Sequence, residues 1–235
     1  MGRLDGKISL VTGAGQGIGR AIAGKLAAEG STVVVTDLDE ATATRTAGQI
    51  RGAVALGLDV TDREAVAATT EEVVRRFGRI DVLVNNAGWD KASRFVDSDP
   101  ADWDRAIAVN LYGQLHTCKA VLPVMVRQGS GAVVNLGSDA GRVGSSGEAV
   151  YSAAKGGVIA FTKSLAREVA RERIRVNCVC PGPTDTALFA AMGGEKLREA
   201  LIRGSRSAGS PIPPTLRTPS PSSPRTRRPS SPGRP

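Results

Sequence analysis

Strand-like and helix-like segments alternate along the first ~180 residues, and this alternation constrains the fold more than any other feature of the chain. Runs rich in β-branched residues predict strands at 7–12, 32–36, 53–58, 81–84, 132–136 and 174–179. Helical periodicity predicts helices at 18–30, 39–51, 62–77, 100–109, 111–128 and 150–171. Strands that alternate with helices of this length predict an α/β fold, a single doubly wound parallel sheet with helices on both faces.

The composition of the chain excludes several classes of protein. No stretch approaches the ~20 apolar residues of a membrane span, and the N-terminus runs directly into a strand without a secretory signal. The three cysteines, Cys118, Cys178 and Cys180, have no spacing typical of a metal site. We therefore expect a cytoplasmic protein that binds no metal and no membrane.

The composition changes abruptly after Arg203. Nine of the thirteen prolines lie at or beyond Pro211, and the stretch 204–235 contains six arginines and no acidic residue. Removing those six charges from the net charge of +8 leaves +2 for residues 1–203. We expect a folded domain at 1–203 and a disordered Ser/Pro/Arg-rich tail at 204–235. The nearly balanced domain argues against nucleic acid as a partner, so this function would depend on the tail alone.

A glycine-rich turn follows the first expected strand. Gly13, Gly17 and Gly19 form the pattern G-x-x-x-G-x-G between a strand and a helix. Glycines let the backbone approach a pyrophosphate, which then meets the positive end of the helix. The turn therefore predicts a dinucleotide site.

Asp37 ends the second expected strand, eighteen residues beyond Gly19. A carboxylate at this position can accept hydrogen bonds from the hydroxyl groups of the adenosine ribose, and it would repel a 2′-phosphate. Asp37 therefore favours NAD over NADP as the cofactor, although it could also cap the next helix.

Tyr151 and Lys155 lie four residues apart in an expected helix, so their side chains share one face. A nearby ammonium group lowers the pKa of a phenol, which prepares Tyr151 for proton transfer. The hydroxyl of Ser138, thirteen residues upstream, could hold a carbonyl oxygen against the phenol.

Taken together, the motifs of residues 4–203 resemble the short-chain dehydrogenase/reductase family. The matching motifs are Thr12-Gly-Ala-Gly-Gln-Gly-Ile-Gly19, Asp59-Val60, Asn85-Asn-Ala-Gly88, Asn110, Ser138, Tyr151-x-x-x-Lys155 and Pro181-Gly182. The resemblance implies a Rossmann-like domain and an oxidoreductase that interconverts a secondary alcohol and a ketone with NAD.

The resemblance also implies roles for individual residues. Tyr151 would be the acid in reduction and the base in oxidation, Lys155 would bind the nicotinamide ribose, Ser138 would bind the substrate oxygen, and Asn110 would position a water molecule. The implied cofactor-binding residues are Gly13, Gln16, Gly17, Ile18, Gly19, Asp37, Leu38, Asp59, Val60, Asn86, Ala87, Gly88, Tyr151, Lys155, Pro181, Gly182, Thr184 and Thr186. His116, the only histidine, lies in an apolar helix and is expected to be structural.

Three segments suggest a narrower substrate class. Asn-Asn-Ala-Gly-Trp89-Asp90, Gly144-Ser-Ser-Gly-Glu148-Ala-Val-Tyr151 and Cys180-Pro-Gly-Pro-Thr-Asp-Thr-Ala-Leu188 resemble 2-hydroxycyclohexanecarboxyl-CoA dehydrogenases, which act on a β-hydroxyacyl-CoA. The alternatives are an enzyme similar to the 3-oxoacyl-carrier-protein reductases and an inactive NAD-binding remnant. The family resemblance further implies a homotetramer.

The tail departs from the family, whose members continue with a helix and a seventh strand. Codons that encode Gly204–Ser210 can be read in a shifted frame as IPLGRL, and codons for 215–234 as DLADAVAFFASDEAAFITGQ, both similar to the usual ending. A reading-frame change near Arg203, in the gene or in its sequencing, accounts for this agreement, and a genuine disordered tail that binds acidic partners is the alternative. The seventh strand is expected to be missing, which would expose a sheet edge and impair tetramer assembly.

Overall fold

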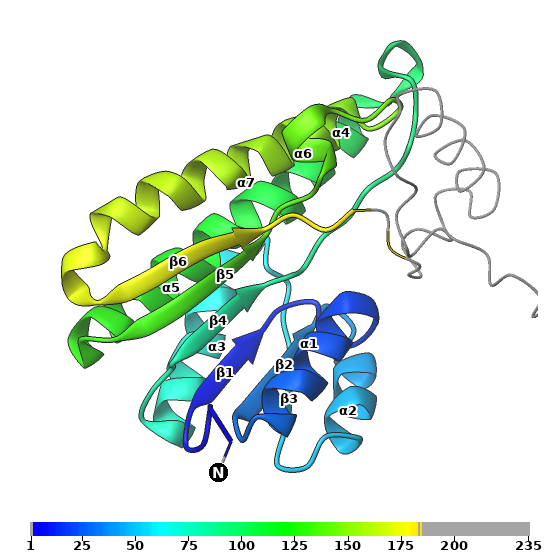
Figure 1. Ribbon diagram of the computed structural model, residues 1–235. Helices are drawn as coiled ribbons and strands as arrows, with labels where there is room; N and C mark the ends of the chain where they lie inside the picture. Colours follow the sequence, from blue (N-terminus) through cyan, green and yellow to red (C-terminus); the bar gives the residue numbers. More distant parts are fainter. Residues whose placement is uncertain (1, 183, 185–235) are drawn as a thin grey trace, which may run out of the picture.

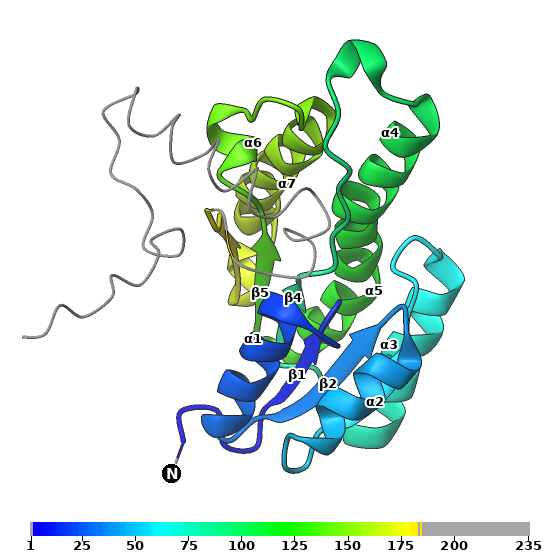
Figure 2. The ribbon, with the colours of Figure 1, turned by 90° about the vertical axis from the view of Figure 1, so that its right-hand side faces the viewer.

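The computed structural model describes residues 2–182 and 184, in which six parallel strands form one sheet in the order β3-β2-β1-β4-β5-β6. The strands are β1 (Ile8–Val11), β2 (Thr32–Asp37), β3 (Val54–Gly57), β4 (Val82–Asn85), β5 (Gly131–Leu136) and β6 (Ile174–Val179). All their arrowheads point toward one side of the molecule in Figure 1, and Figure 2 turns that side toward the viewer. The predicted doubly wound parallel sheet is confirmed.

Helices cover both faces of this sheet (Figure 1). The α-helices are α1 (Gly17–Ala28), α2 (Glu40–Gly48), α3 (Arg63–Phe77), α4 (Pro100–Ile107), α5 (Gly113–Gln128), α6 (Ala140–Val143) and α7 (Ala149–Glu168). One apolar cluster joins α3, α5 and α7 to one face through residues such as Val73, Met125 and Leu165. A second cluster joins α1 and α2 to the other face through Ala23 and Ala43.

The stretch 100–128 differs from the two separate helices that the sequence predicts. A π-helical turn, η2 (Ala108–Tyr112), joins α4 to α5 without a break. Short 3₁₀ turns, η1 (Phe95–Asp97) and η3 (Ala170–Glu172), and the one-turn helix α6 were not predicted. A single turn is too short to show the apolar periodicity that identifies a longer helix, so the sequence does not predict these elements.

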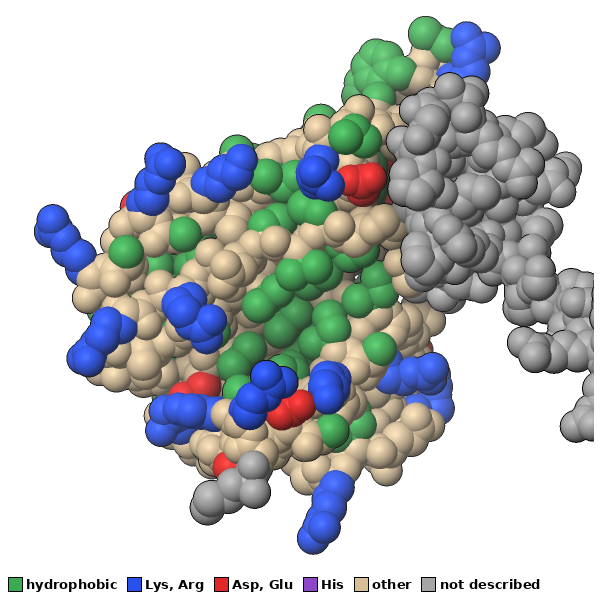
Figure 3. Space-filling view, viewed as in Figure 1, with side chains coloured by type: hydrophobic (Ala, Val, Ile, Leu, Met, Phe, Trp, Pro, Cys, Tyr) green, Lys and Arg blue, Asp and Glu red, His purple; other side chains and the backbone are tan. Residues whose placement is uncertain are grey.

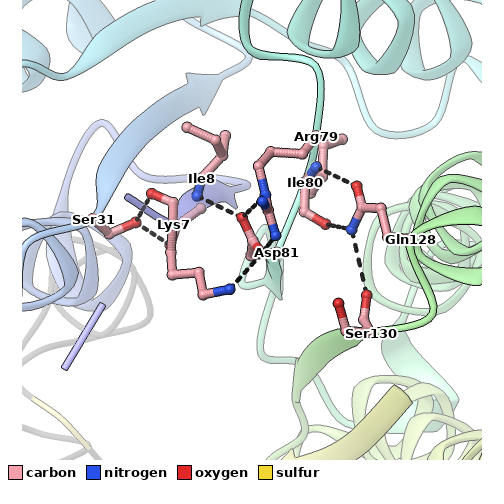
Figure 4. A network of polar contacts seen from close by, with 9 residues as sticks. Lys7, Ile8, Ser31, Arg79, Ile80, Asp81, Gln128 and Ser130 are labelled. Atoms are coloured by element: carbon pink, nitrogen blue, oxygen red, sulfur yellow. Dashed lines mark hydrogen bonds and ion pairs between the residues drawn. The ribbon is translucent and has the colours of Figure 1, made fainter. Parts of the chain in front are cut away.

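A polar cluster closes the edge at which the strands begin (Figure 4). The buried Asp81 accepts hydrogen bonds from the Arg79 guanidinium at 2.8 Å, the Ile8 N–H at 3.0 Å and the Lys7 ammonium at 3.1 Å. Gln128, at the end of α5, accepts a bond from the Ile80 N–H at 2.9 Å. These bonds tie β1, β4 and α5 together at the end opposite the glycine-rich turn.

The sheet face covered by α1 and α2 is only partly shielded among the described residues. Figure 3 shows hydrophobic side chains gathered across the middle of this face. Val82 of β4 and Val134 of β5 are half-buried there, and Val179 of β6 is exposed. In the described part of the chain β6 pairs with β5 alone and is the edge of the sheet.

Several predictions fall outside the described residues. They concern the missing seventh strand, the disordered tail at 204–235, the frame change near residue 203, and Thr186. No helix within the described ranges is both long and apolar enough to cross a membrane.

Candidate active site

The glycine-rich turn lies at the edge where the strands end, between β1 and α1. Gly13 has a φ of 59°, and a Cβ placed there would lie 2.7 Å from the Ala87 Cα. A Cβ on Gly19 would lie 2.3 Å from the Gly13 carbonyl oxygen. Only glycine fits these two positions, which explains the spacing of the motif. Gln16 precedes the first residue of α1, and Ile18 lies in its first turn.

The Asn-Asn-Ala-Gly segment after β4 holds this turn in place. The Asn86 side-chain amide donates to the Thr12 and Gly13 carbonyl oxygens at 3.0 and 2.8 Å. The Thr12 hydroxyl accepts bonds from the N–H groups of Asn86 and Ala87 at 3.0 and 3.1 Å. The Asn86 side chain therefore fixes the turn, a role that the sequence analysis did not assign to it.

Asp37 closes β2 beside the turn. Its carboxylate accepts a hydrogen bond from the Gly15 N–H at 2.9 Å and another from the Asp39 N–H at 3.2 Å. Leu38 is exposed next to it. A half-buried carboxylate thus lies against the glycine-rich turn, where a dinucleotide ribose would meet it.

Asp59 and Val60 follow β3. Asp59 is exposed, and its carboxylate accepts bonds from the N–H and hydroxyl of Thr61 at 2.8 and 2.7 Å. Val60 is buried, and its carbonyl oxygen lies 3.0 Å from the His116 Nδ1. His116 thus joins α5 to this loop, in agreement with a structural role.

Ser138, Tyr151 and Lys155 come together at the same edge. Ser138 lies two residues beyond β5, and the other two lie one turn apart in α7. The Lys155 Nζ lies 5.6 Å from the centroid of the Tyr151 ring and donates to the Leu136 carbonyl oxygen at 2.8 Å. Gly88 lies close by, since a Cβ there would lie 3.8 Å from the Lys155 Nζ.

The pKa of Tyr151 corrects a prediction from the sequence. Burial, together with the negative charges of Asp90 and Glu148, raises this pKa to about 12, although the Ser138 hydroxyl lowers it. Burial also lowers the pKa of Lys155 to about 8. The expected lowering of the phenol pKa by Lys155 is therefore wrong for the protein alone, because the sequence did not reveal the depth of burial or the two carboxyl groups.

The π-helical turn η2 positions Asn110 at the site. The Asn110 side-chain amide donates to the Ala106 carbonyl oxygen at 2.8 Å and to that of Trp89 at 2.5 Å, and its oxygen accepts from the Trp89 N–H at 3.3 Å. A π-helical turn leaves backbone groups without their usual helical partners and often occurs at functional sites. Asn110 is fully buried and anchors the loop that follows β4.

A buried polar network lies beneath these residues. The Asn85 amide donates to the Asn135 side-chain oxygen at 2.8 Å, and the Asn135 amide donates to the Thr162 hydroxyl at 2.9 Å. The Thr117 hydroxyl donates to the Asn85 side-chain oxygen at 2.6 Å. The four side chains join β4, β5, α5 and α7, and they set the positions of the elements that carry the site.

The segment that follows β6 is bonded to the loop after β5. The Pro181 carbonyl oxygen accepts a bond from the Asp139 N–H at 3.0 Å, and the Thr184 hydroxyl donates to the Gly182 carbonyl oxygen at 2.9 Å. This segment therefore runs beside the loop that carries Ser138.

A pocket beside Tyr151 contains three carboxyl groups, of Asp90, Asp102 and Glu148, that the sequence analysis did not single out as site residues. The pocket is lined by Trp89, Asp90, Lys91, Ser93, Phe95, Ser98, Asp102, Trp103, Ala106, Gly147, Glu148, Ala149, Val150 and Tyr151. Burial and the neighbouring charge of Glu148 raise the pKa of Asp90 to about 7. Glu148 lies three residues before Tyr151, and Asp90 directly follows the Asn-Asn-Ala-Gly-Trp segment, so proximity to the motifs was the available signal.

The residues at this edge fit a dinucleotide cofactor. The N–H groups of the first turn of α1 have no partners within the helix, and the glycine-rich turn leaves the backbone free of side chains there. Asp37 suits the ribose hydroxyls, and Tyr151 and Lys155 lie at the far end of the same edge.

Comparisons with known proteins agree with this geometry. A model of the short-chain dehydrogenase family matches residues 7–196. A curated 3-oxoacyl-[acyl-carrier-protein] reductase FabG of Thermotoga maritima is 40% identical over 204 residues, which cover 85% of this chain and 82% of the relative. The FabG of Escherichia coli K12 is 40% identical over 194 residues, covering 82% of this chain and 79% of the relative.

A mammalian relative and a solved structure are also similar to this chain. The 3-oxoacyl-[acyl-carrier-protein] reductase of Bos taurus is 37% identical over 199 residues, or 84% of each chain. A crystal structure described as ribose-5-phosphate isomerase from Brucella melitensis 16M superposes with a TM-score of 0.78 at 39% identity, covering 84% of this chain and 78% of the other. The chain belongs to the short-chain dehydrogenase family, whose members are oxidoreductases that act on CH–OH groups with a nicotinamide cofactor.

Proposed function

We propose that this protein interconverts a secondary alcohol and a ketone with NAD(H), using Tyr151 as the proton donor and acceptor. The observation that carries the proposal is the meeting of Ser138, Tyr151 and Lys155 at the edge that also holds the glycine-rich turn. The bound nicotinamide would supply or accept the hydride. The protein's own residues would position the substrate oxygen and move its proton.

In the reducing direction, the raised pKa of Tyr151 suits the role of an acid. A phenol with a pKa of about 12 is protonated at neutral pH and can donate to the oxygen of a ketone as negative charge develops there. The Ser138 hydroxyl would donate a second hydrogen bond to the same oxygen. Lys155, buried behind Tyr151, would hold the nicotinamide ribose.

Asp37 supports NAD rather than NADP. Its carboxylate is held against the turn by the Gly15 N–H, and a 2′-phosphate beside it would meet like charge. The FabG relatives do not decide this preference, which depends on Asp37 and the neighbouring Leu38. We expect Asp37→Ser combined with Leu38→Arg to shift the NADP/NAD ratio of kcat/KM upward by about 100-fold, because the change removes a repulsive charge and adds an attractive one.

For the substrate we propose a β-hydroxyacyl or β-ketoacyl thioester. The names of the curated relatives, 3-oxoacyl-[acyl-carrier-protein] reductases, support this class. The segments around Trp89, Glu148 and Cys180 favour coenzyme A as the carrier, with acyl carrier protein as the alternative. Assays with the CoA and carrier-protein thioesters of one acyl group would distinguish the two.

The decisive experiment replaces Tyr151 with Phe. We expect the turnover of a β-ketoacyl-CoA with NADH to fall at least about 100-fold while NADH still binds, because the change removes only the phenolic hydroxyl that carries the transferred proton. Tyr112→Phe is the matched control, since Tyr112 is the other tyrosine and lies exposed on η2. Unchanged turnover in Tyr151→Phe would refute the mechanism.

The alternative of an inactive NAD-binding remnant predicts NADH binding without turnover in the unaltered chain. It depends on residues beyond the described part, as do the proposed homotetramer and the frame change. Size-exclusion chromatography of this chain beside a frame-restored version tests assembly. We expect a sharp tetramer peak only from the restored chain, and equal peaks would contradict this expectation.

A further inference from the structure

Asp90 and Glu148 bring two carboxyl groups together beside Tyr151. Asp90 belongs to the loop after β4, and Glu148 directly precedes α7. The two loops are joined by a bond from the Ser93 N–H to the Gly147 carbonyl oxygen at 2.8 Å. Both side chains line the pocket beside Tyr151, and their charges raise the pKa of its phenol.

The pair of carboxyl groups does not stabilise the fold through hydrogen bonds that would account for its burial. The Asp90 Oδ2 is buried and has no hydrogen-bond partner among the described residues. A buried carboxylate oxygen without a partner destabilises a protein, and two neighbouring carboxylates repel each other. Such a cost is tolerated mainly at functional sites.

Among the described residues that line the pocket, three carry carboxyl groups, Asp90, Asp102 and Glu148, and one, Lys91, carries an ammonium group. Lys91 lines the same pocket, but its ammonium is bound to the Asp102 carboxylate at 2.7 Å. Lys155 lies behind Tyr151 and donates to the Leu136 carbonyl oxygen. Among the described residues that line the pocket, a substrate that extends past Tyr151 therefore meets Asp90 and Glu148 and no unpaired cation.

We propose that Asp90 and Glu148 determine substrate specificity by rejecting β-keto acids with a free carboxylate and admitting their neutral esters and thioesters. This inference rests on the proposed function and narrows its substrate class. A β-keto acid and its ester present the same ketone to Tyr151 and Ser138, so the proton-transfer residues cannot separate them. The group two carbons away differs in charge, and a negative charge near the pair in a partly dehydrated pocket is strongly disfavoured.

The test compares acetoacetate with ethyl acetoacetate in NADH-dependent reduction by the full chain. We expect the unaltered protein to favour the ester in kcat/KM by about tenfold or more. In the double variant Asp90→Asn/Glu148→Gln, the ester/acid ratio of kcat/KM should fall about tenfold, because kcat/KM for acetoacetate rises. The ratio is the readout because both changes also alter the pKa of Tyr151, and that effect applies equally to the two substrates.

Asp97→Asn is the matched control. It removes one carboxylate from the exposed turn η1, outside the residues that line the pocket, and should leave the ratio unchanged. An unaltered protein without preference, or a double variant that keeps the original ratio, would overturn the inference. Absence of reduction of both compounds and of all thioesters would instead refute the proposed function.

Discussion

Tyr151 shows how the surroundings of one residue set its chemistry. The sequence places a lysine one helical turn away, yet burial and two carboxyl groups raise the pKa of the phenol to about 12. A strongly protonated phenol favours the donation of a proton to a ketone. The environment therefore suits the reducing direction at neutral pH better than the oxidising one.

This environment predicts a pH dependence. In alcohol oxidation Tyr151 must be deprotonated, so kcat/KM should rise with pH between 6 and 8, by up to tenfold per unit. Lys155, with a pKa of about 8, is mostly ionised up to pH 7 and half ionised near pH 8, whereas Asp90 titrates near pH 7. For ketone reduction, kcat/KM should not rise with pH over this range, because Tyr151 is already protonated.

Initial rates in both directions at fixed ionic strength check this expectation. In the variant Asp90→Asn/Glu148→Gln the rising limb should move to lower pH, because two charges that raise the pKa of Tyr151 are gone. An oxidation rate that is independent of pH across the range would contradict the assignment of Tyr151 as the base.

At the scale of elements, the sequence predicted the strands well and the connections less well. The range 174–179 agrees with β6, and Asp81–Val84 differs from β4 (Val82–Asn85) by one residue. A strand is indicated by the residue types of its own short run, so it can be recognised from the sequence. The π-helical turn at Ala108–Tyr112 and the proximity of Asp90 to Glu148 depend on tertiary contacts, which no local pattern encodes.

The same limit applies to the candidate site. Tyr151, Lys155 and the glycine-rich turn follow from motif spacing, but the side-chain role of Asn86 emerged only when its bonds to the turn were seen. An asparagine in the tetrapeptide Asn85-Asn-Ala-Gly88 can contact a cofactor or support the backbone, and the sequence does not distinguish these roles.

Two glycines of α1 provide a matched test of the turn. Gly19→Ala would place a Cβ 2.3 Å from the Gly13 carbonyl oxygen, so it should destabilise the protein by about 1–3 kcal/mol and abolish NADH binding. Gly24 lies in the same helix with open space around it, and Gly24→Ala should stabilise the protein by up to about 1 kcal/mol. Urea unfolding and NADH titration measure both effects, and similar behaviour of the two variants would argue against the tight packing.

The buried network beneath the site predicts a second matched pair. Asn135→Ala leaves the Asn85 amide and the Thr162 hydroxyl with fewer partners in a fully buried position, so we expect a loss of about 2–4 kcal/mol in the free energy of unfolding. Asn177→Ala makes the same change at an exposed position of β6 and should alter stability by less than about 0.5 kcal/mol. Equal losses in chemical denaturation would show that the network contributes nothing of its own.

At the scale of the whole molecule, the candidate site and a stabilising polar cluster lie at opposite edges of the sheet. The candidate site gathers where the strands end, and the Asp81 cluster lies where they begin (Figure 4). Burial alone would raise the pKa of Asp81, but the bonds from Arg79, Ile8 and Lys7 outweigh it and lower this pKa below its usual value. The ionised cluster therefore stabilises the protein at neutral pH.

Asp81→Asn should cost about 3 kcal/mol in the free energy of unfolding at pH 7, because it leaves two cations without their buried partner. A carboxyl group whose folded pKa is lowered contributes its stability above its unfolded pKa of about 3.9 and loses it as the pH falls through the folded value. The difference between the variant and the unaltered protein should thus shrink toward pH 3. Urea denaturation at both pH values, with Asp97→Asn as a surface control, would contradict the idea if the difference stayed constant.

The two tryptophans of the chain, Trp89 and Trp103, both line the pocket beside Tyr151. The Arg105 guanidinium lies 4.6 Å from the centre of the Trp89 ring, and Trp103 stacks on Phe95 with ring centres 4.9 Å apart. All intrinsic indole fluorescence of the protein therefore originates at this one pocket. Its emission can report on an occupant directly, without an added dye or a coupled assay.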